Sequence, residues 1–467
     1  MPTAPAHPPE TAQGSITILD PATGVPVGTL ESASAEQARY ALGRARKASA
    51  GWAATAPAER GELLHAAARA LEDAAAELAE LNQRETGKPH ADALGGVQAG
   101  AATLRQYAEL GPLHRGHSLR GGQQAMDYTV TVPRGVAVLL TPWNDPVAVA
   151  CGLIGAALAT GNVVVHKPSE RCPHVGRLMG RLLAEVFPQD VVVTVTGGPD
   201  TGQALVEAPE TDVIGHVGST ATGERLARLA ALTGAHLLRE NGGNDPLLID
   251  EGIDPAWAAD QAALGSFANA GQICTSVERI YVHRSIAEAF CRELTERARA
   301  LNASGELAPL VDERMRQEVH DQVTEALEHG ARAAEGGSIP EGAGARYPAT
   351  VLLDCTSSMR IMQEETFGPV APVTVVDDFA SGLRAASAGR YGLAATVLTG
   401  NLTHAQEAIA TLPVGTVKVN NVFGGAPGGA AQPRGASGDG FGYGPELLDE
   451  FTFVKVVHVA EPRAVAP

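Results

Sequence analysis

Short apolar runs typical of buried strands alternate with helical segments along most of the chain. GNVVVHKPSE, DVVVTVTGGPD and TDVIGHVGSTATGERLARLA each set a strand-like run directly before a helical pattern. Strands that alternate with helices favour a parallel, doubly wound sheet, because the crossover helices cover its faces. A second series begins at Asp245 and contains IYVHRS, ATVLLD, APVTVVDD, AATVLTG and GTVKVN. The alternation therefore predicts an α/β protein with two doubly wound domains.

Other segments complete this organisation. Apolar positions from Ser34 to Arg84 recur at helical spacing, and the pattern stops at Gly87 and Pro89. MDYTVTVPRGVAVLL predicts an extended hairpin that breaks at PRG and continues as a buried strand. The apolar window 146–160 is too short to span a bilayer and predicts a buried helix. A last strand-like run, FTFVKVVHV, ends at residue 459.

Length and charge limit the classes of protein to which the chain can belong. At 467 residues it is too long for one core, and two to three units are expected. Its net charge of −18 disfavours nucleic acid and anionic membranes as partners. The start, MPTAPAHPPETAQG, has no basic segment and no apolar run, so we expect a disordered lead-in over residues 1–14 and a cytoplasmic protein.

The five cysteines are scattered, with no C-x-x-C pair and no histidine at metal-ligand spacing. Neither a disulfide framework nor a metal site is expected. One of them, Cys274 in FANAGQICTSVERIYV, lies between a Gly-Gln turn and a β-branched run, where a thiol can act as a nucleophile. The alternative is a small buried hydrophobe, the usual role of a free cysteine. Upstream, Glu240 in LLRENGGNDP precedes paired glycines and supplies the carboxylate that thioester chemistry requires.

The chain has no G-x-G-x-x-G dinucleotide fingerprint. Its substitute is the run from Gly218 to Gly223, GSTATG, which follows VIGHV and opens a helix whose N–H groups and dipole can face a pyrophosphate. An ordinary capped helix start is the alternative. Lys167 and Glu170 in HKPSE follow the carboxyl end of a strand, where open α/β sheets bind ligands, although a solvated lysine and acid would give the same pattern.

Four segments, TPWN, ENGGNDP, GQICTSVER and EETFGPV, resemble in this order the signature segments of the NAD(P)-dependent aldehyde dehydrogenase superfamily. The resemblance extends from Ile18 to Val459 and implies a Rossmann-like cofactor domain, a catalytic domain and a small β oligomerisation element. By this resemblance residues 15–114 and 134–242 bind NAD and residues 243–446 form the catalytic domain. Residues 115–133 and 447–467 supply the oligomerisation strands of a homodimer or homotetramer.

The resemblance also assigns roles. Cys274 attacks the aldehyde carbonyl, the Asn144 amide and the Cys274 backbone N–H bind the oxyanion, and Glu240 activates water that hydrolyses the thioester. A hydride leaves the thiohemiacetal for NAD, with NADP as the alternative cofactor. Glu365 grips the nicotinamide ribose, with Glu364 as the fallback. The other implied cofactor-binding residues are Trp143, Lys167, Glu170, Gly218, Ser219, Gly223 and Phe367.

Two other functions are compatible with these segments. A CoA-acylating aldehyde dehydrogenase uses the same cysteine but needs no hydrolytic glutamate, and a non-catalytic binding or structural protein could keep the fold. Position 145, often aromatic in relatives, is Asp145 here. Its carboxylate could project into the substrate tunnel and favour cationic or hydroxylated aldehydes, or it could cap the helix that begins at Pro146.

Overall fold

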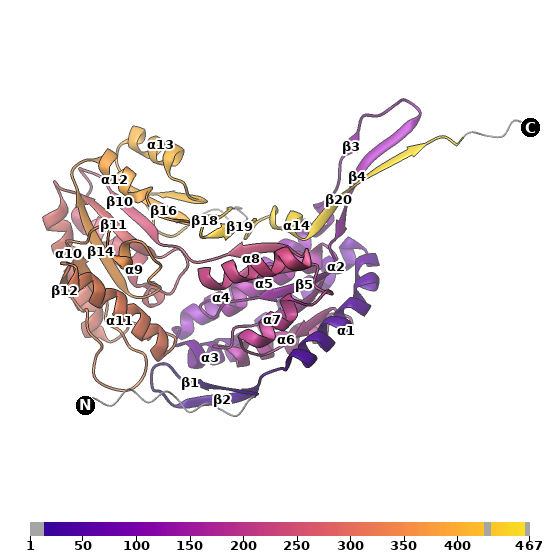
Figure 1. Ribbon diagram of the computed structural model, residues 1–467, viewed down its shortest axis with the longest axis horizontal. Helices are drawn as coiled ribbons and strands as arrows, with labels where there is room; N and C mark the ends of the chain where they lie inside the picture. The colour runs from indigo at the N-terminus through magenta and orange to yellow at the C-terminus, as the bar shows by residue number, and fades with distance from the viewer. Residues whose placement is uncertain (1–13, 425–430, 463–467) are drawn as a thin grey trace, which may run out of the picture.

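The computed structural model describes residues 14–424 and 431–462 and shows two α/β domains joined side by side (Figure 1). The predicted fold class is confirmed. Most of the predicted lead-in, residues 425–430 of the glycine-rich loop at 424–444 and the last five residues lie outside the described residues.

The first domain is built on a six-stranded sheet of order β19-β9-β8-β5-β6-β7, in which only β19 runs antiparallel to its neighbour. Strands β5, β6 and β8 are buried on both faces, as their continuous apolar runs predict. Its strands are β5 (Val136–Leu140), β6 (Val163–Lys167), β7 (Val192–Thr194), β8 (Val213–Val217), β9 (His236–Glu240) and β19 (Gly438–Asp439).

Helices cover both faces of this sheet (Figure 1). The buried helix predicted at 146–160 is α5, and nearly all of its residues are inaccessible. The helical pattern from Ser34 forms three helices, the last of which ends at Gly87 in the left-handed conformation. The helices are α1 (Ala35–Ala54), α2 (Pro57–Asp73), α3 (Ala75–Thr86), α4 (His90–Leu110), η1 (Gly111–Leu113), α5 (Pro146–Ala159), α6 (Pro173–Val186), α7 (Pro199–Val206) and α8 (Thr220–Thr233).

The second domain is built on a seven-stranded sheet of order β12-β13-β14-β11-β10-β16-β17. All five predicted runs form parallel strands, and the sequence analysis missed β12, an antiparallel strand at the edge. The strands are β10 (Asp245–Ile249), β11 (Val277–His283), β12 (Arg332–Glu335), β13 (Thr350–Leu353), β14 (Val370–Val376), β16 (Ala394–Leu398) and β17 (Thr416–Val419). The helices are α9 (Pro255–Phe267), η2 (Ala268–Gly271), α10 (Ala287–Ser304), α11 (Glu313–Glu328), η3 (Arg360–Met362), α12 (Phe379–Ala386) and α13 (Leu402–Thr411).

A three-stranded antiparallel ribbon of order β20-β4-β3 projects from the first domain (Figure 1). It consists of β3 (Ser118–Leu119), β4 (Ala125–Pro133) and β20 (Thr452–Ala460), and the short helix α14 (Leu447–Glu450) leads into it. Large apolar side chains on it are exposed, with Val454 at 70% and Val456 at 67%. The remaining elements are the hairpin β1 (Ser15–Leu19) with β2 (Pro26–Glu31) and the pair β15 (Tyr391–Gly392) with β18 (Arg434–Gly435).

Candidate active site

The predicted cofactor and catalytic residues of the first domain gather at one edge of its sheet. Lys167 and Glu240 end β6 and β9, and Trp143 and Gly218 follow β5 and β8. These four strands are parallel, so their carboxyl ends meet at the same edge, where open α/β sheets bind ligands. The topology therefore brings together residues that lie up to about a hundred positions apart.

The loop that carries Cys274 has an unusual backbone. Asn269, Ala270 and Gly271 adopt φ angles of 48°, 54° and 72° in succession, and two of them are not glycine. The Gln272 side chain anchors the following turn, because its Nε2 donates to the Pro309 carbonyl at 3.2 Å and its Oε1 accepts from the Val311 N–H at 2.9 Å. The turn presents Cys274 as an exposed thiol, whereas Cys151, Cys172 and Cys355 are buried.

The thiol of Cys274 is accessible yet surrounded by protein and by negative charge. Loss of solvation, followed by the carboxylates of Glu240, Asp245 and Glu365, raises its pKa to about 12. The Lys418 ammonium opposes this rise. A thiol with so high a pKa is protonated at neutral pH, so the nucleophile needs a base nearby.

Glu240 has the properties of such a base. Loss of solvation raises the pKa of its carboxyl to about 7. Within the described residues no hydrogen bond reaches this carboxylate, while its backbone pairs with Gly438 in β19. The glycine-rich loop closes over it so tightly that a Cβ at Gly442 would overlap the carboxylate. Glu240 is therefore poised to gain or lose a proton near neutral pH.

Asn144 contacts the turn that carries Cys274. Its Nδ2 donates to the Gln272 carbonyl oxygen at 3.2 Å, two residues before the cysteine. An amide donor at this point lies beside the nucleophile although it follows a strand of the other domain. The arrangement suits a donor to negative charge that develops on a substrate oxygen.

Trp143 and Phe367, both predicted to bind cofactor, pack edge to face with ring centroids 5.6 Å apart. Phe367 has a φ of 51°, in the left-handed region. Its N–H donates to Oε1 of the buried Glu278 at 2.7 Å, and the Thr366 N–H donates to Oε2 at 2.9 Å. Burial raises the pKa of Glu278 to about 7, and these hydrogen bonds oppose the rise.

Glu365 precedes this turn and lies against the paired glycines that follow Glu240. Its Oε1 accepts from the Gly243 N–H at 3.0 Å, and a Cβ at Gly242 would overlap its carboxylate. Burial, followed by the charges of Glu278 and Asp245, raises its pKa well above the usual value. The glycines thus let ENGGNDP and EETFGPV approach each other closely. Glu364, the fallback, is exposed and paired with Arg360.

The start of α8 is a capped helix start beside β9. Ser219 caps the helix by accepting from the Thr222 N–H, and the Gly218 N–H donates to the Glu240 carbonyl at 3.0 Å. A Cβ at Gly223 would collide with the Asn241 side chain, so a larger residue there would push the helix from β9. The glycines of GSTATG thus bring the helix start beside Glu240.

Lys167 and Glu170 contact each other, with Nζ to Oε2 at 3.4 Å, and Lys167 also donates to the Pro168 carbonyl at 3.2 Å. Loss of solvation lowers the pKa of Lys167, and Glu170 partly offsets this effect. In the described part of the chain neither residue has a hydrogen bond or ion pair with the Cys274 loop. They form a separate polar pair at the β6 end of the site.

Asp145 occupies the N-cap position of α5, but its side chain makes no capping hydrogen bond. Its Oδ1 instead lies 3.3 Å from Nζ of Lys88, which also donates to the Asn144 carbonyl at 3.3 Å. The capping explanation for Asp145 is therefore wrong, because its carboxylate turns toward a lysine rather than toward the helix N–H groups.

Sequence reasoning missed Asp245, Glu278, Lys418 and Lys88 as parts of this site. Glu278 and Arg279 interrupt the apolar pattern of VERIYVH in a buried strand, which is a signal that could have identified them. Lys88 offers no comparable signal, because its partners lie 56 and 57 positions away.

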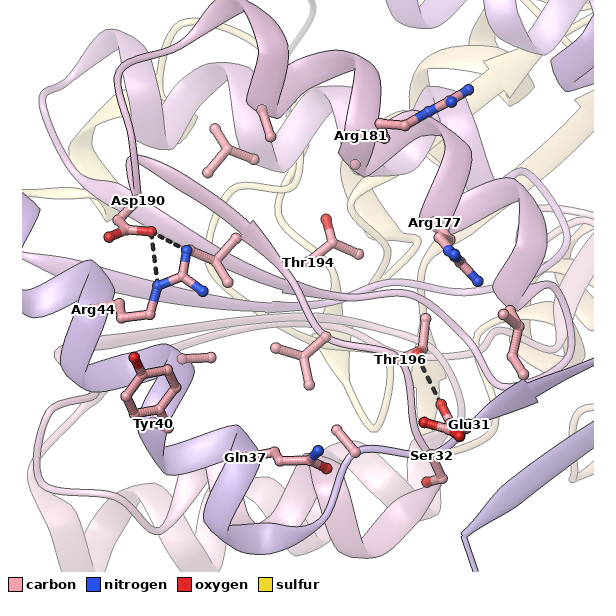
Figure 2. Close-up of a pocket in the computed structure, with 18 of the residues that line it drawn as sticks. Glu31, Ser32, Gln37, Tyr40, Arg44, Arg177, Arg181, Asp190, Thr194 and Thr196 are labelled. Carbon is pink, nitrogen blue, oxygen red and sulfur yellow. Dashed lines mark hydrogen bonds and ion pairs between the residues drawn. The ribbon is translucent and has the colours of Figure 1, made fainter.

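A cavity of about 810 Å³ lies elsewhere, between α1, α6 and β7 (Figure 2). Arg44, Arg177, Arg181 and Asp190 line it, and Arg44 pairs with Asp190 across one end. None of the predicted site residues borders it. The chemistry of the site, rather than the size of a cavity, therefore locates the candidate active site.

Comparisons with known proteins find relatives over nearly the whole chain. The model of the aldehyde dehydrogenase family matches residues 9–457. A betaine aldehyde dehydrogenase of Sinorhizobium fredii is 33% identical over 98% of this chain and 96% of its own length. An alpha-ketoglutarate semialdehyde dehydrogenase of Haloferax volcanii is 35% identical over 85% of this chain and 84% of its own. The crystal structure of betaine aldehyde dehydrogenase from Staphylococcus aureus in complex with NAD+ superposes with a TM-score of 0.93, at 28% identity, over 97% of this chain and 93% of that one.

Proposed function

The chain belongs to the aldehyde dehydrogenase family and oxidises aldehydes with NAD(P), and from that premise we propose that Cys274 is its nucleophile and Glu240 its base. The observation that carries the proposal is the convergence of three groups from distant segments. Glu240 acts on the Cys274 thiol electrostatically, and the Asn144 amide bonds the same turn. Nucleophile, base and oxyanion donor are the parts that acyl transfer requires.

In the proposed reaction Glu240 takes the proton of the Cys274 thiol, and the thiolate attacks the aldehyde carbon. The carbonyl oxygen becomes an oxyanion, which the Asn144 amide and the Cys274 backbone N–H stabilise. Collapse of this thiohemiacetal with loss of a hydride leaves a thioester on Cys274. Glu240 releases the thiol proton to solvent and then takes a proton from water as the hydroxide attacks the thioester. The C–S bond of this second adduct breaks, the carboxylic acid leaves, and Glu240 returns its proton to the Cys274 thiolate.

The residues at the sheet edge fit NAD. The helix start at Ser219 suits the pyrophosphate, Lys167 and Glu170 suit the adenine ribose, and Glu365 suits the nicotinamide ribose, with Trp143 and Phe367 beside it. The glycines at 218, 223 and 242 let the side chains of His216, Asn241 and Glu365 pack directly against the backbone of the site. When bound, NAD accepts the hydride. In this proposal residues 15–114 and 134–242 form the cofactor domain and residues 243–446 the catalytic domain.

The preference for NAD over NADP is also a proposal. The Glu170 carboxylate can accept a hydrogen bond from a ribose 2′-hydroxyl and would repel a 2′-phosphate. Its pairing with Lys167 keeps the carboxylate at the carboxyl end of β6.

Hydrolysis, rather than transfer of the acyl group to CoA, is favoured by Glu240. A carboxyl whose pKa is raised to about 7 can accept a proton from water at neutral pH, and a CoA-acylating enzyme has no need of it. The same three groups disfavour a non-catalytic role, since an exposed thiol near a carboxyl of raised pKa serves no packing purpose.

An assay of NADH formation tests this function. The panel contains a cationic, a carboxylate-bearing and a neutral aliphatic aldehyde, because the names of the relatives above point to the first two classes. Each is assayed with and without CoA. We expect NADH and the free acid without CoA, and a strict requirement for CoA would contradict the hydrolytic proposal. Lys88 neutralises Asp145, so we expect no advantage for a cationic aldehyde from this residue.

We also propose that the ribbon of β3, β4 and β20 pairs with a second copy in a homodimer or homotetramer. Its exposed valines and unpaired strand edges are a liability in a monomer. Light scattering that gives the mass of one 48.1 kDa chain would contradict this.

We also propose that the protein is cytoplasmic. All five cysteines are free, as a reducing compartment allows. No helix among the described residues is long and apolar enough to cross a bilayer.

A further inference from the structure

Lys88 connects two elements at the site although it was not among the predicted residues. It lies between Gly87, which ends α3 in the left-handed conformation, and Pro89, which precedes α4. Gly87 is closely packed, since a Cβ there would meet Pro309 and Pro21. The packing of Gly87 therefore fixes the backbone next to Lys88, independently of the contacts of the lysine side chain.

The Lys88 side chain is only 11% exposed, and its ammonium contacts two consecutive residues. Nζ lies 3.3 Å from the Asn144 carbonyl oxygen and 3.3 Å from Oδ1 of Asp145. A buried ammonium is costly unless it is paired and hydrogen-bonded, so these contacts hold the lysine and the 144–145 backbone together.

Asp145 is enclosed from the opposite side by α4. A Cβ at Gly96 would lie 2.5 Å from its Oδ1, so the helix approaches the carboxylate directly. That oxygen is buried and has no hydrogen bond within the described residues. Lys88 is its only ion-pair partner there. Burial raises the pKa of Asp145, and Lys88 opposes the rise.

The side-chain amide of Asn144 contacts the turn that carries Cys274. Its amide donates to the Gln272 carbonyl, while its own carbonyl accepts from Lys88. The residue is thus fixed at both ends, by Lys88 at the backbone and by the Cys274 turn at the side chain. When the amide turns from Gln272 to a substrate oxyanion, the contact with Lys88 is the one that remains.

We propose that Lys88, paired with Asp145, is a positioning residue that holds Asn144 so that its amide meets the oxyanion formed at Cys274. The inference rests on the proposed role of Asn144 as oxyanion donor. Lys88 touches neither substrate nor cofactor in this role and acts through Asn144 alone.

A double-mutant cycle on the full-length enzyme tests it. Asn144→Ala alone is expected to lower kcat roughly 10²- to 10³-fold, the usual cost of an oxyanion donor. Lys88→Met alone is expected to lower kcat about 10- to 100-fold with an unchanged KM for NAD, because a misplaced donor weakens only the transition state. In the Asn144→Ala background Lys88→Met should change kcat by less than about twofold, since Lys88 is proposed to act only through the Asn144 amide, which is absent there. Lys47→Met, at an exposed lysine of α1, is the matched control.

The outcomes distinguish a failure of the positioning role of Lys88 from a failure of the oxyanion role of Asn144. Full activity in Asn144→Ala would remove the oxyanion role itself. A slow Asn144→Ala with an unaffected Lys88→Met, or equal effects of Lys88→Met in both backgrounds, would overturn the positioning role alone.

Loss of the lysine also leaves the half-buried Asp145 carboxylate without its ion-pair partner, so Lys88→Met can lower stability. The variant Lys88→Met/Asp145→Asn removes that charge. We expect it to regain melting temperature but not kcat, whereas recovery of kcat would show that the unpaired carboxylate, and not the position of Asn144, caused the loss.

Discussion

The cofactor side and the nucleophile side of the site are built in different ways. On the cofactor side Lys167 and Glu170 belong to the β6–α6 unit and the GSTATG helix start to the β8–α8 unit of the same sheet. Each contact there lies within a few residues or between adjacent strands. On the nucleophile side Cys274 lies 34 positions after Glu240 (274 − 240), and the contact between ENGGNDP and EETFGPV, from Gly243 to Glu365, spans 122 positions. Buried carboxylates and left-handed residues hold them together. Local sequence therefore specifies the first region, and long-range contacts specify the second.

The largest effect is expected from loss of the thiol on the nucleophile side, which should leave the cofactor side intact. Cys274→Ala should lower oxidation roughly 10³-fold or more, because no other group forms the covalent bond, while NAD binding stays unchanged. Steady-state rates and calorimetric titration with NAD measure the two properties. Cys291→Ala, at a half-buried cysteine, is the control and should keep its rate. Retention of more than a few per cent of turnover in Cys274→Ala would contradict the mechanism.

Glu240→Gln should lower turnover about 10²- to 10⁴-fold, because it keeps the shape of the side chain but removes the base. Acyl-enzyme should then accumulate, and intact-mass spectrometry would detect it as an adduct on Cys274. An adduct-free enzyme with normal rates would exclude Glu240 from the reaction.

The same residue predicts the pH dependence of the wild type. Its folded-state pKa is raised to about 7, and only the ionised form accepts a proton, so kcat should rise as pH increases through about 7. In the Glu240→Gln variant, kcat should no longer rise with pH through this range. Because the folded pKa exceeds the unfolded one, ionised Glu240 destabilises the fold as pH rises through this range, and Glu240→Gln should melt higher than the wild type at pH 8 but not at pH 5.

A smaller effect is expected at Glu278, which tests whether long-range contacts hold the nucleophile side. Glu278→Gln replaces one acceptor of the Thr366 and Phe367 N–H groups with an NH₂ group, at a cost of about 1–3 kcal/mol. The loop that carries Glu365 should loosen, with a lower melting temperature and a KM for NAD raised about tenfold. Glu364→Gln, at the exposed neighbour, is the control. Equal effects of the two changes would show that the loop does not depend on the buried carboxylate.

The smallest effect is expected on the cofactor side, at Glu170. The wild type should favour NAD over NADP in kcat/KM, and Glu170→Gln should narrow that ratio roughly tenfold or less by removing the repulsion of a 2′-phosphate. Measurement of kcat/KM with both cofactors tests this. A wild-type ratio in favour of NADP would refute the assignment of Glu170.

Much of the fold could be predicted because its signals are local. Continuous apolar runs such as VVVHK and VAVLL need burial on both faces, and only a covered parallel sheet supplies it. The edge strand β12 was missed because RAAE, half exposed and short, has no such pattern. The Asp145 cap was wrong for a related reason: position and residue type satisfied the local rule, but Lys88 offered a stronger partner.

The sequence by itself determined the two α/β domains and the residue types available for chemistry, because periodicity and the glycines at the turns act over a few positions. Only the tertiary structure decided which carboxyl groups lose solvation, so that Glu240 titrates near neutral pH while the exposed Glu364 pairs with Arg360. It also decided that Lys88 reaches Asn144 and Asp145. Solvation and ion pairing depend on atoms brought within a few ångströms by the whole fold, and no local spacing in the chain records those distances.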